Sequence, residues 1–228
     1  AELANVLNEA AIVATINKHK AITREDLDEA VKKVTVGIQK TSRVISDKDK
    51  KLTAYHEAGH AVVSKFLSSV EDVKEISIIP RGFAGGYTLY KTDEDKFYIS
   101  KTQMEEKLVA LLGGRVADKL AINDISTGAS NDIEVATKIA KDMVTVYGMS
   151  DVVGPISLKT DNPYELQLFG ENIEDTVGKE IKKLIDTAYK RAELILSENM
   201  DLLHEIAQAL LIKETITSEE FEEFFNRI

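Results

Sequence analysis

The stretch His56-Glu57-Ala58-Gly59-His60 places two imidazoles four residues apart, with a carboxylate directly after the first. If residues 47–67 form one helix, positions 56 and 60 lie on nearly the same face, about 6 Å apart along the axis. Both rings can then reach one metal ion, and Glu57 can reach a water on that ion without binding the metal itself. We therefore interpret His56 and His60 as metal ligands and Glu57 as a general base, the arrangement of His-Glu-x-x-His hydrolases.

The alternative is that both histidines are ordinary buried helix residues. Leu52, Val63 and Leu67 continue their stripe at helical spacing, which fits a helix face turned to the core. Burying two imidazoles and a carboxylate costs several kcal/mol unless a partner satisfies them, and a metal ion does so. The metal site is the stronger interpretation.

Composition narrows the classes of function. The chain has 228 residues, 43% hydrophobic content and a formal net charge of -10, which suits a folded domain and argues against nucleic acid as the main partner. It contains no cysteine, so nitrogen and oxygen atoms must supply every metal ligand. No apolar run is long enough for a membrane span, and we expect no signal peptide within this sequence. The first residues already have the pattern of a helix interior, so we expect a piece of a longer protein.

Hydrophobic periodicity predicts a mainly α fold with a small β-sheet. Thr23, Ser46, Ser100 and Thr217 are expected to cap helices. The Gly113-Gly114 pair predicts a close contact between two helices, since glycine is costly inside a helix. Helices are expected at 1–17, 23–35, 47–67, from 100, from 132 to 148, at 173–197, 201–212 and from 217; strands at 73–79 and 86–90; a linker at 36–46; and irregular chain at 150–172.

A catalytic zinc ion generally takes three protein ligands, so a third must come from elsewhere in the chain. Asp132 is the best candidate, because it follows small residues and lies in the first turn of a helix, where the dipole favours a carboxylate. The same position also suits an aspartate that only stabilises its helix start. Asp118 and Glu71 are rivals, whereas His19 and His204 lie in segments without comparable neighbours.

Three segments carry a resemblance to a known family: residues 55–61 around the histidine motif, Ile78-Ile79-Pro80-Arg81-Gly82, and residues 126–137, which begin Ser-Thr-Gly-Ala-Ser-Asn-Asp. Gly113-Gly114-Arg115 and residues 147–150 add to it. On these motifs the chain resembles the FtsH-type AAA metalloproteases, membrane-anchored and ATP-dependent peptidases of bacteria, mitochondria and chloroplasts.

The resemblance implies one zinc ion per chain, held by His56, His60 and Asp132, with Glu57 activating water. It implies a helical zinc-peptidase domain at residues 46–228, a linker at 36–45, and at 1–35 a helical hairpin from the end of an AAA lid. It also implies a homo-hexamer, unfolded or membrane protein substrates, and a full-length protein anchored in the bacterial inner membrane, or its organellar equivalent, with this domain on the cytoplasmic side.

Substrate binding is expected by addition of an extended peptide to a strand. The candidates are Ile76 and Ile78 on the first expected strand and Gly86 and Tyr87 on the second.

Two departures from the family pattern matter. Lys119 stands where the family often has a second acidic residue after Gly-Gly-Arg. The phosphate-binding motif Gly-x-x-x-x-Gly-Lys-Ser/Thr does not occur in this sequence, so we expect ATP to be bound and hydrolysed by a part of the protein that this chain lacks. A different class of function would be a catalytically silent helical module that holds a ring together.

Overall fold

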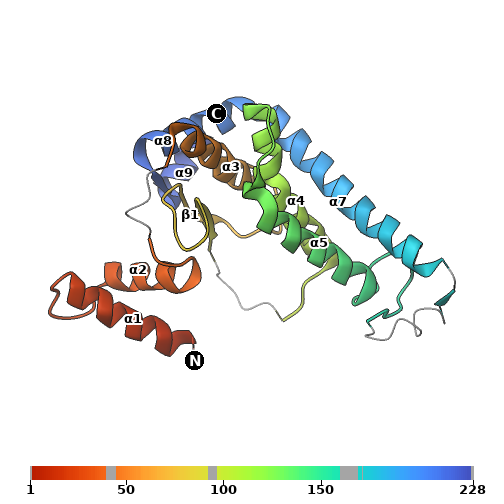
Figure 1. Ribbon diagram of the computed structural model, residues 1–228, viewed down its shortest axis with the longest axis horizontal. Helices are drawn as coiled ribbons and strands as arrows, with labels where there is room; N and C mark the ends of the chain where they lie inside the picture. Colours follow the sequence, from red (N-terminus) through yellow and green to blue (C-terminus); the bar gives the residue numbers. More distant parts are fainter. Residues whose placement is uncertain (1, 40–44, 92–96, 160–168, 171, 227–228) are drawn as a thin grey trace.

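The computed structural model describes residues 2–39, 45–91, 97–159, 169–170 and 172–226. It confirms the mainly helical fold with a small sheet (Figure 1). The linker residues 40–44 and Pro163 lie outside the described residues. The helices are α1 (Glu2–Ile16), α2 (Arg24–Thr35), α3 (Asp47–Lys65), α4 (Lys101–Ala117), α5 (Ser130–Thr145), α7 (Ile173–Glu198), α8 (Met200–Lys213) and α9 (Ser218–Phe225), with a π-helical turn η1 (Asp118–Ile122) and a 3₁₀ turn η2 (Thr127–Ala129).

Four helices begin at the predicted caps. The side chains of Thr23, Ser46, Ser100 and Thr217 each accept a hydrogen bond from a backbone N–H in the first turn. In three of them the side chain at the third helical position returns the bond, which completes a capping box. These local bonds fix where each helix starts, and Ser46 thereby sets the start of the helix that carries both histidines.

Helices α3 and α4 cross at unusually close range. A Cβ atom at Gly59 would lie 2.4 Å from the Ala117 side chain and 2.7 Å from the Gly113 carbonyl oxygen. A Cβ atom at Gly113 would in turn lie 2.9 Å from the Gly59 carbonyl oxygen. The predicted close contact is confirmed, and α4 stays a continuous helix through both glycines. Around this crossing, residues from α3, α4, α5, α7 and α8 form one hydrophobic core.

The sheet has three antiparallel strands in the order β2-β1-β3. Strand β1 (Val73–Ser77) pairs with β2 (Tyr87–Tyr90) on one side and with β3 (Thr215–Thr217) on the other. The sequence analysis missed β3, because three residues between two helices are too short to show alternation and Thr217 also caps α9. Strand β1 is therefore the central strand and β2 an edge strand.

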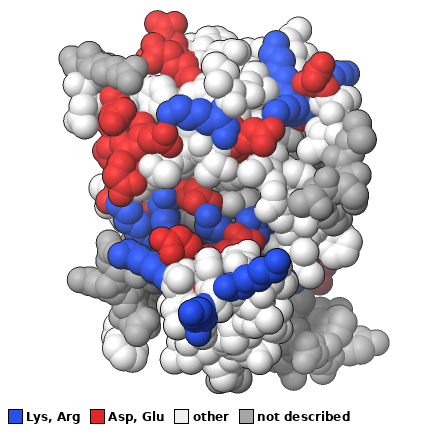
Figure 2. Space-filling model, turned by 90° about the vertical axis from the view of Figure 1, so that its left-hand side faces the viewer, with Lys and Arg blue, Asp and Glu red and all other residues white. Residues whose placement is uncertain are grey.

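The α1–α2 hairpin packs beside this sheet (Figure 1). The Arg81 guanidinium, 5% exposed, donates to both carboxylate oxygens of Glu29 on α2 at 2.8 Å, and Lys32 donates to Glu75 on β1 at 2.6 Å. The Gly82 N–H also donates to the Ile38 carbonyl oxygen at 3.0 Å, so part of the expected linker is bound to the loop between β1 and β2. Figure 2 shows charges of both signs gathered across the middle of this face.

Candidate metal centre

Three possible ligand atoms converge from two helices. His56 and His60 project from the middle of α3, and Asp132 lies in the first turn of α5. The two Nε2 atoms lie 3.2 Å apart, and the Asp132 Oδ2 atom lies 3.2 Å from the first and 3.3 Å from the second. A tetrahedral zinc ion with bonds of about 2.0–2.1 Å requires ligand atoms about 3.3–3.4 Å apart. The triangle therefore has the size of one face of a zinc coordination sphere.

The other nitrogen of each imidazole has a protein partner. His56 Nδ1 lies 3.1 Å from Asp118 Oδ2, and His60 Nδ1 lies 2.9 Å from the Ala110 carbonyl oxygen. With these Nδ1 atoms donating, both Nε2 lone pairs are available to a metal. Asp118 is only 1% exposed and begins the π-helical turn η1. Asp118, the alternative to Asp132 as third ligand, thus lies at the Nδ1 side of the His56 ring, where it can hold the ring in orientation.

Gly114 leaves the space that the two rings occupy. A Cβ atom at this position would lie 2.6 Å from His56 Cε1 and Nε2 and 2.6 Å from His60 Nε2. The glycine pair thus has two functions: Gly113 lets α3 and α4 approach, and Gly114 makes room for the imidazoles.

The carboxylates make the cluster strongly attractive to a cation. Burial disfavours a charged ring at His56, but hydrogen bonds to Asp118 and Asp132 outweigh it and raise the pKa of His56 to about 10. Burial would raise the pKa of Asp132, yet its hydrogen bonds with both imidazoles hold that pKa well below its usual range. A proton and a metal ion therefore compete for the same nitrogen atom of His56.

Glu57 lies beside the three ligand atoms without joining them. Its side chain is almost fully buried, and burial raises the pKa of Glu57 above its ordinary value. The Thr88 hydroxyl on β2 donates to Glu57 Oε2 at 2.9 Å. A buried carboxylate that lies beside the three possible ligand atoms is placed to act as a general base.

Comparison with known proteins agrees with this geometry. The model of peptidase family M41 matches residues 43–224. The chain belongs to this family. It is 50% identical to the "ATP-dependent zinc metalloprotease FtsH 1" of Thermoanaerobacter sp. over 99% of the chain and 38% of that relative, and 52% identical to the FtsH of Caldicellulosiruptor bescii over 97% of the chain and 37% of that relative. FtsH 4 of Synechocystis is 40% identical over 100% of the chain and 38% of that relative. The chain thus spans little more than a third of the relatives it matches.

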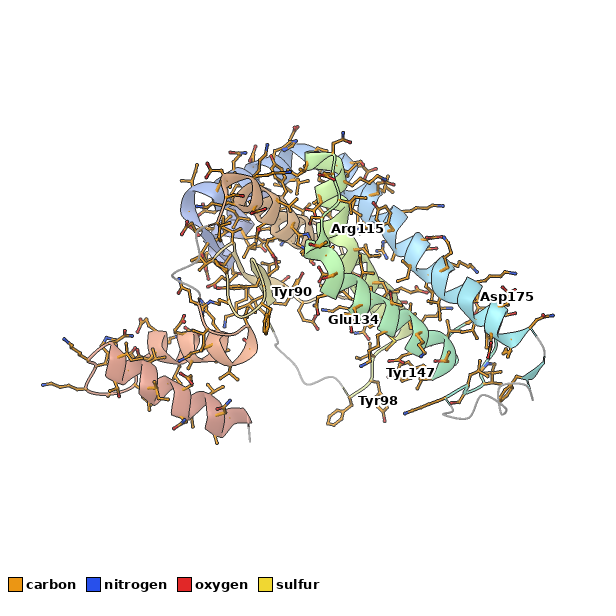
Figure 3. The ribbon with its side chains drawn as sticks, viewed as in Figure 1. Tyr90, Tyr98, Arg115, Glu134, Tyr147 and Asp175 are labelled. Carbon is orange, nitrogen blue, oxygen red and sulfur yellow. The ribbon has the colours of Figure 1, made fainter. Side chains whose placement is uncertain are left out.

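A groove of about 900 Å³ opens in front of the ligand triangle of this M41 chain. Figure 3 labels Tyr90, which lines the groove from β2, and Glu134, which lies near the start of α5. Its walls come from α3, α4, β2 and the turn before α5, and they include His56, Glu57, Gly86, Tyr87, Thr88, Tyr90, Lys107, Leu111 and Asp132.

Only part of the predicted substrate strand pair borders this groove. Gly86 and Tyr87 line it, Tyr87 as the first residue of the edge strand β2 and Gly86 directly before it. Ile76 and Ile78 are buried at 0% and 3% exposure, and Ile76 lies on β1, which has partners on both sides. Ile76 and Ile78 therefore lie in the hydrophobic core and are not among the residues that line the groove, and β1 already has a partner strand on each edge. No sequence signal separated the two strands, because β3 was not recognised.

The remaining candidate ligands have other environments. His19 Nδ1 lies 2.8 Å from Asp26, and His204 Nδ1 lies 3.0 Å from the Tyr55 hydroxyl. Within the described residues, the group that could hold a metal ion is His56, His60 and Asp132, so neither Glu71 nor the other two histidines join it. Thr88 was missed by the sequence analysis, since a threonine in a strand carries no signal of its own.

Proposed function

We propose that this chain is the zinc-dependent endopeptidase part of an FtsH-type ATP-dependent protease. The observation that carries the proposal is the triangle of His56 Nε2, His60 Nε2 and Asp132 Oδ2, with sides of 3.2–3.3 Å and Glu57 beside it. We assign one zinc ion per chain to these three ligands. The relatives' printed names, which include the words "zinc metalloprotease", support the choice of metal.

Each side chain has a distinct part in hydrolysis. When bound, zinc supplies Lewis-acid chemistry, lowering the pKa of a water molecule and polarising the scissile carbonyl. His56 and His60 are held in their ligating orientation by Asp118 and the Ala110 carbonyl. Glu57 takes a proton from the attacking water and delivers it to the leaving amine nitrogen.

The substrate is an extended polypeptide. Among the described residues, β2 has a partner strand on one edge only, and an incoming backbone can add to its other edge as a fourth strand beside Gly86 and Tyr87. Strand addition uses hydrogen bonds to the substrate backbone and requires an unfolded segment, so we infer that the substrates are unfolded, misassembled or regulatory proteins.

The organisation of the wider protein is proposed from the resemblance of the sequence to the FtsH-type proteases. We propose that residues 1–35 end an AAA lid, residues 36–45 link it to the peptidase domain, and residues 46–228 form that domain. ATP then acts through an ATPase part outside this sequence, within a homo-hexamer anchored in a membrane. In the described chain, no helix combines the length and hydrophobicity needed to span a bilayer.

Glu57→Gln tests the assignment. The variant should keep its zinc, since Glu57 is not a ligand, and lose cleavage of unfolded casein by at least about 100-fold. Glu198→Gln, at the exposed end of α7, is the matched control and should retain full activity. Retained cleavage by Glu57→Gln refutes the role of Glu57. A wild-type chain that binds no zinc when prepared without chelators supports the silent assembly module instead.

A further inference from the structure

We propose that Thr88 is a positioning residue that holds the carboxylate of Glu57 for proton transfer; this inference rests on the proposed function. The Thr88 hydroxyl lies 2.9 Å from Glu57 Oε2. It makes the only hydrogen bond to that carboxylate within the described part of the chain. The base is thus carried by α3 but oriented by β2.

The backbone at Gly86, directly before β2, also packs against the methylene groups of Glu57. A Cβ atom at Gly86 would lie 3.0 Å from Glu57 Cγ, 2.7 Å from Thr53 Cγ2 and 2.7 Å from the Ser77 carbonyl oxygen. Glycine at this position therefore allows the start of β2 to lie directly on the side chain of the base. Gly86 limits the movement of the methylene groups, and Thr88 fixes the rotation of the carboxylate.

This hydrogen bond matters because the base faces an open groove. The terminal torsion of glutamate is broad, so packing of the stem alone does not select one carboxylate orientation. A general base must present its oxygen within hydrogen-bond reach of the proton it takes, and small misplacements are costly in rate. One donor on the edge strand supplies the missing constraint.

A purely structural role is the competing explanation. The same hydroxyl lies 3.3 Å from the backbone carbonyl oxygen of Glu57, so it could instead tie β2 to α3. The two roles differ in what they require: the structural bond survives removal of the Glu57 side chain, and the positioning bond does not.

Kinetics on the zinc-loaded chain give the first readout. Thr88→Val preserves the shape of the side chain and removes the donor. With a fluorogenic peptide, kcat should fall about 10-fold or more while KM stays within about twofold and zinc content is unchanged. Thr88→Ser restores the hydroxyl and should recover kcat to within about threefold. Thr145→Val is the matched control, since its hydroxyl bonds only the Lys141 carbonyl within α5.

A double-mutant cycle on the metal-free chain gives a readout that does not need activity. Thr88→Val should lower the thermal midpoint of the wild type by about 2–4 °C, because it leaves a buried carboxylate without its donor. In a Glu57→Ala background the same change should have no effect.

An equal loss in both backgrounds assigns the hydroxyl to the backbone carbonyl and overturns the inference. The inference also fails if kcat is unchanged in Thr88→Val, if KM alone rises, or if Thr88→Ser is as slow as Thr88→Val. A wild-type chain that binds zinc but cleaves nothing refutes the proposed function, whereas the midpoint cycle still decides whether Thr88 bonds the carboxylate.

Discussion

Gly114→Ala should disable the metal centre by adding one methyl group. The new Cβ would lie 2.6 Å from the Nε2 atoms of His56 and His60, about 0.8 Å inside the 3.4 Å at which ordinary contact begins. Helix α4 cannot withdraw, because Gly113 packs directly on Gly59. The rings cannot turn without losing the hydrogen bonds of their Nδ1 atoms.

The expected magnitude follows from the tolerance of a metal site. Zinc–ligand distances vary by only about 0.2 Å, so moving an imidazole by 0.8 Å removes it as a ligand. We expect zinc affinity to fall by at least about 100-fold. The metal-free chain should change much less, since overpacking costs about 1–3 kcal/mol and the better helix propensity of alanine returns about 1 kcal/mol.

Competition with a chromophoric chelator measures the affinity, and thermal unfolding with and without chelator measures the coupling of zinc to folding. Gly178→Ala is the matched control. This exposed glycine lies inside α7 with nothing within 4 Å of an added Cβ. It should raise the midpoint by about 2–4 °C and leave zinc affinity unchanged. Wild-type zinc affinity in Gly114→Ala would refute the reasoning.

Three further predictions concern the surroundings of the site. Asp118→Ala should weaken zinc binding by about 10–100-fold in the chelator assay, because His56 loses the partner of Nδ1. Because the pKa of His56 is raised to about 10, its protonation stabilises the metal-free fold below about pH 6.5, and this contribution is lost as the pH rises through about 10. Over that range the thermal unfolding midpoint of the chain kept in chelator should fall, while its affinity for zinc should rise. Glu29→Ala should lower the unfolding free energy by about 1–3 kcal/mol in denaturant titrations, because the buried Arg81 loses its ion-pair partner. The control is Asp28→Ala, which removes the half-exposed pair with Lys74 at 3.9 Å and should cost under about 0.5 kcal/mol.

Most of the fold could be predicted because its signals are local. The caps at Thr23, Ser46, Ser100 and Thr217 depend on residues within one turn, and the long helices repeat their apolar pattern several times. Strand β3 could not be predicted in this way. It is formed by three residues whose partner lies about 140 positions earlier, so only the assembled core creates it.

The candidate site likewise combines features that depend on local sequence with features that depend on the packing of distant segments. The spacing of His56 and His60 on one helix is a local property, and by itself it indicates both the metal and the base. The placement of Asp118 depends on how the end of α4 packs against α3, and that of Asp132 on how α5 packs against α4. The local sequence pattern therefore indicates both aspartates as candidates, but it does not distinguish a metal ligand from a residue that orients a ligand.

The order of the sheet connects substrate binding to the chemistry. Strand β3 occupies the second edge of β1, and of the two outer strands only β2 has residues among those that line the groove. Under the proposed function, an extended substrate therefore adds at β2. Strand β2 also contacts the base: Thr88 bonds its carboxylate, and Gly86, directly before the strand, packs on its methylene groups. A peptide bound along β2 therefore rests on the same element that orients Glu57. On this reasoning, a change that shifts the register of β2 should reduce substrate affinity and turnover together, whereas Thr88→Val should reduce turnover alone.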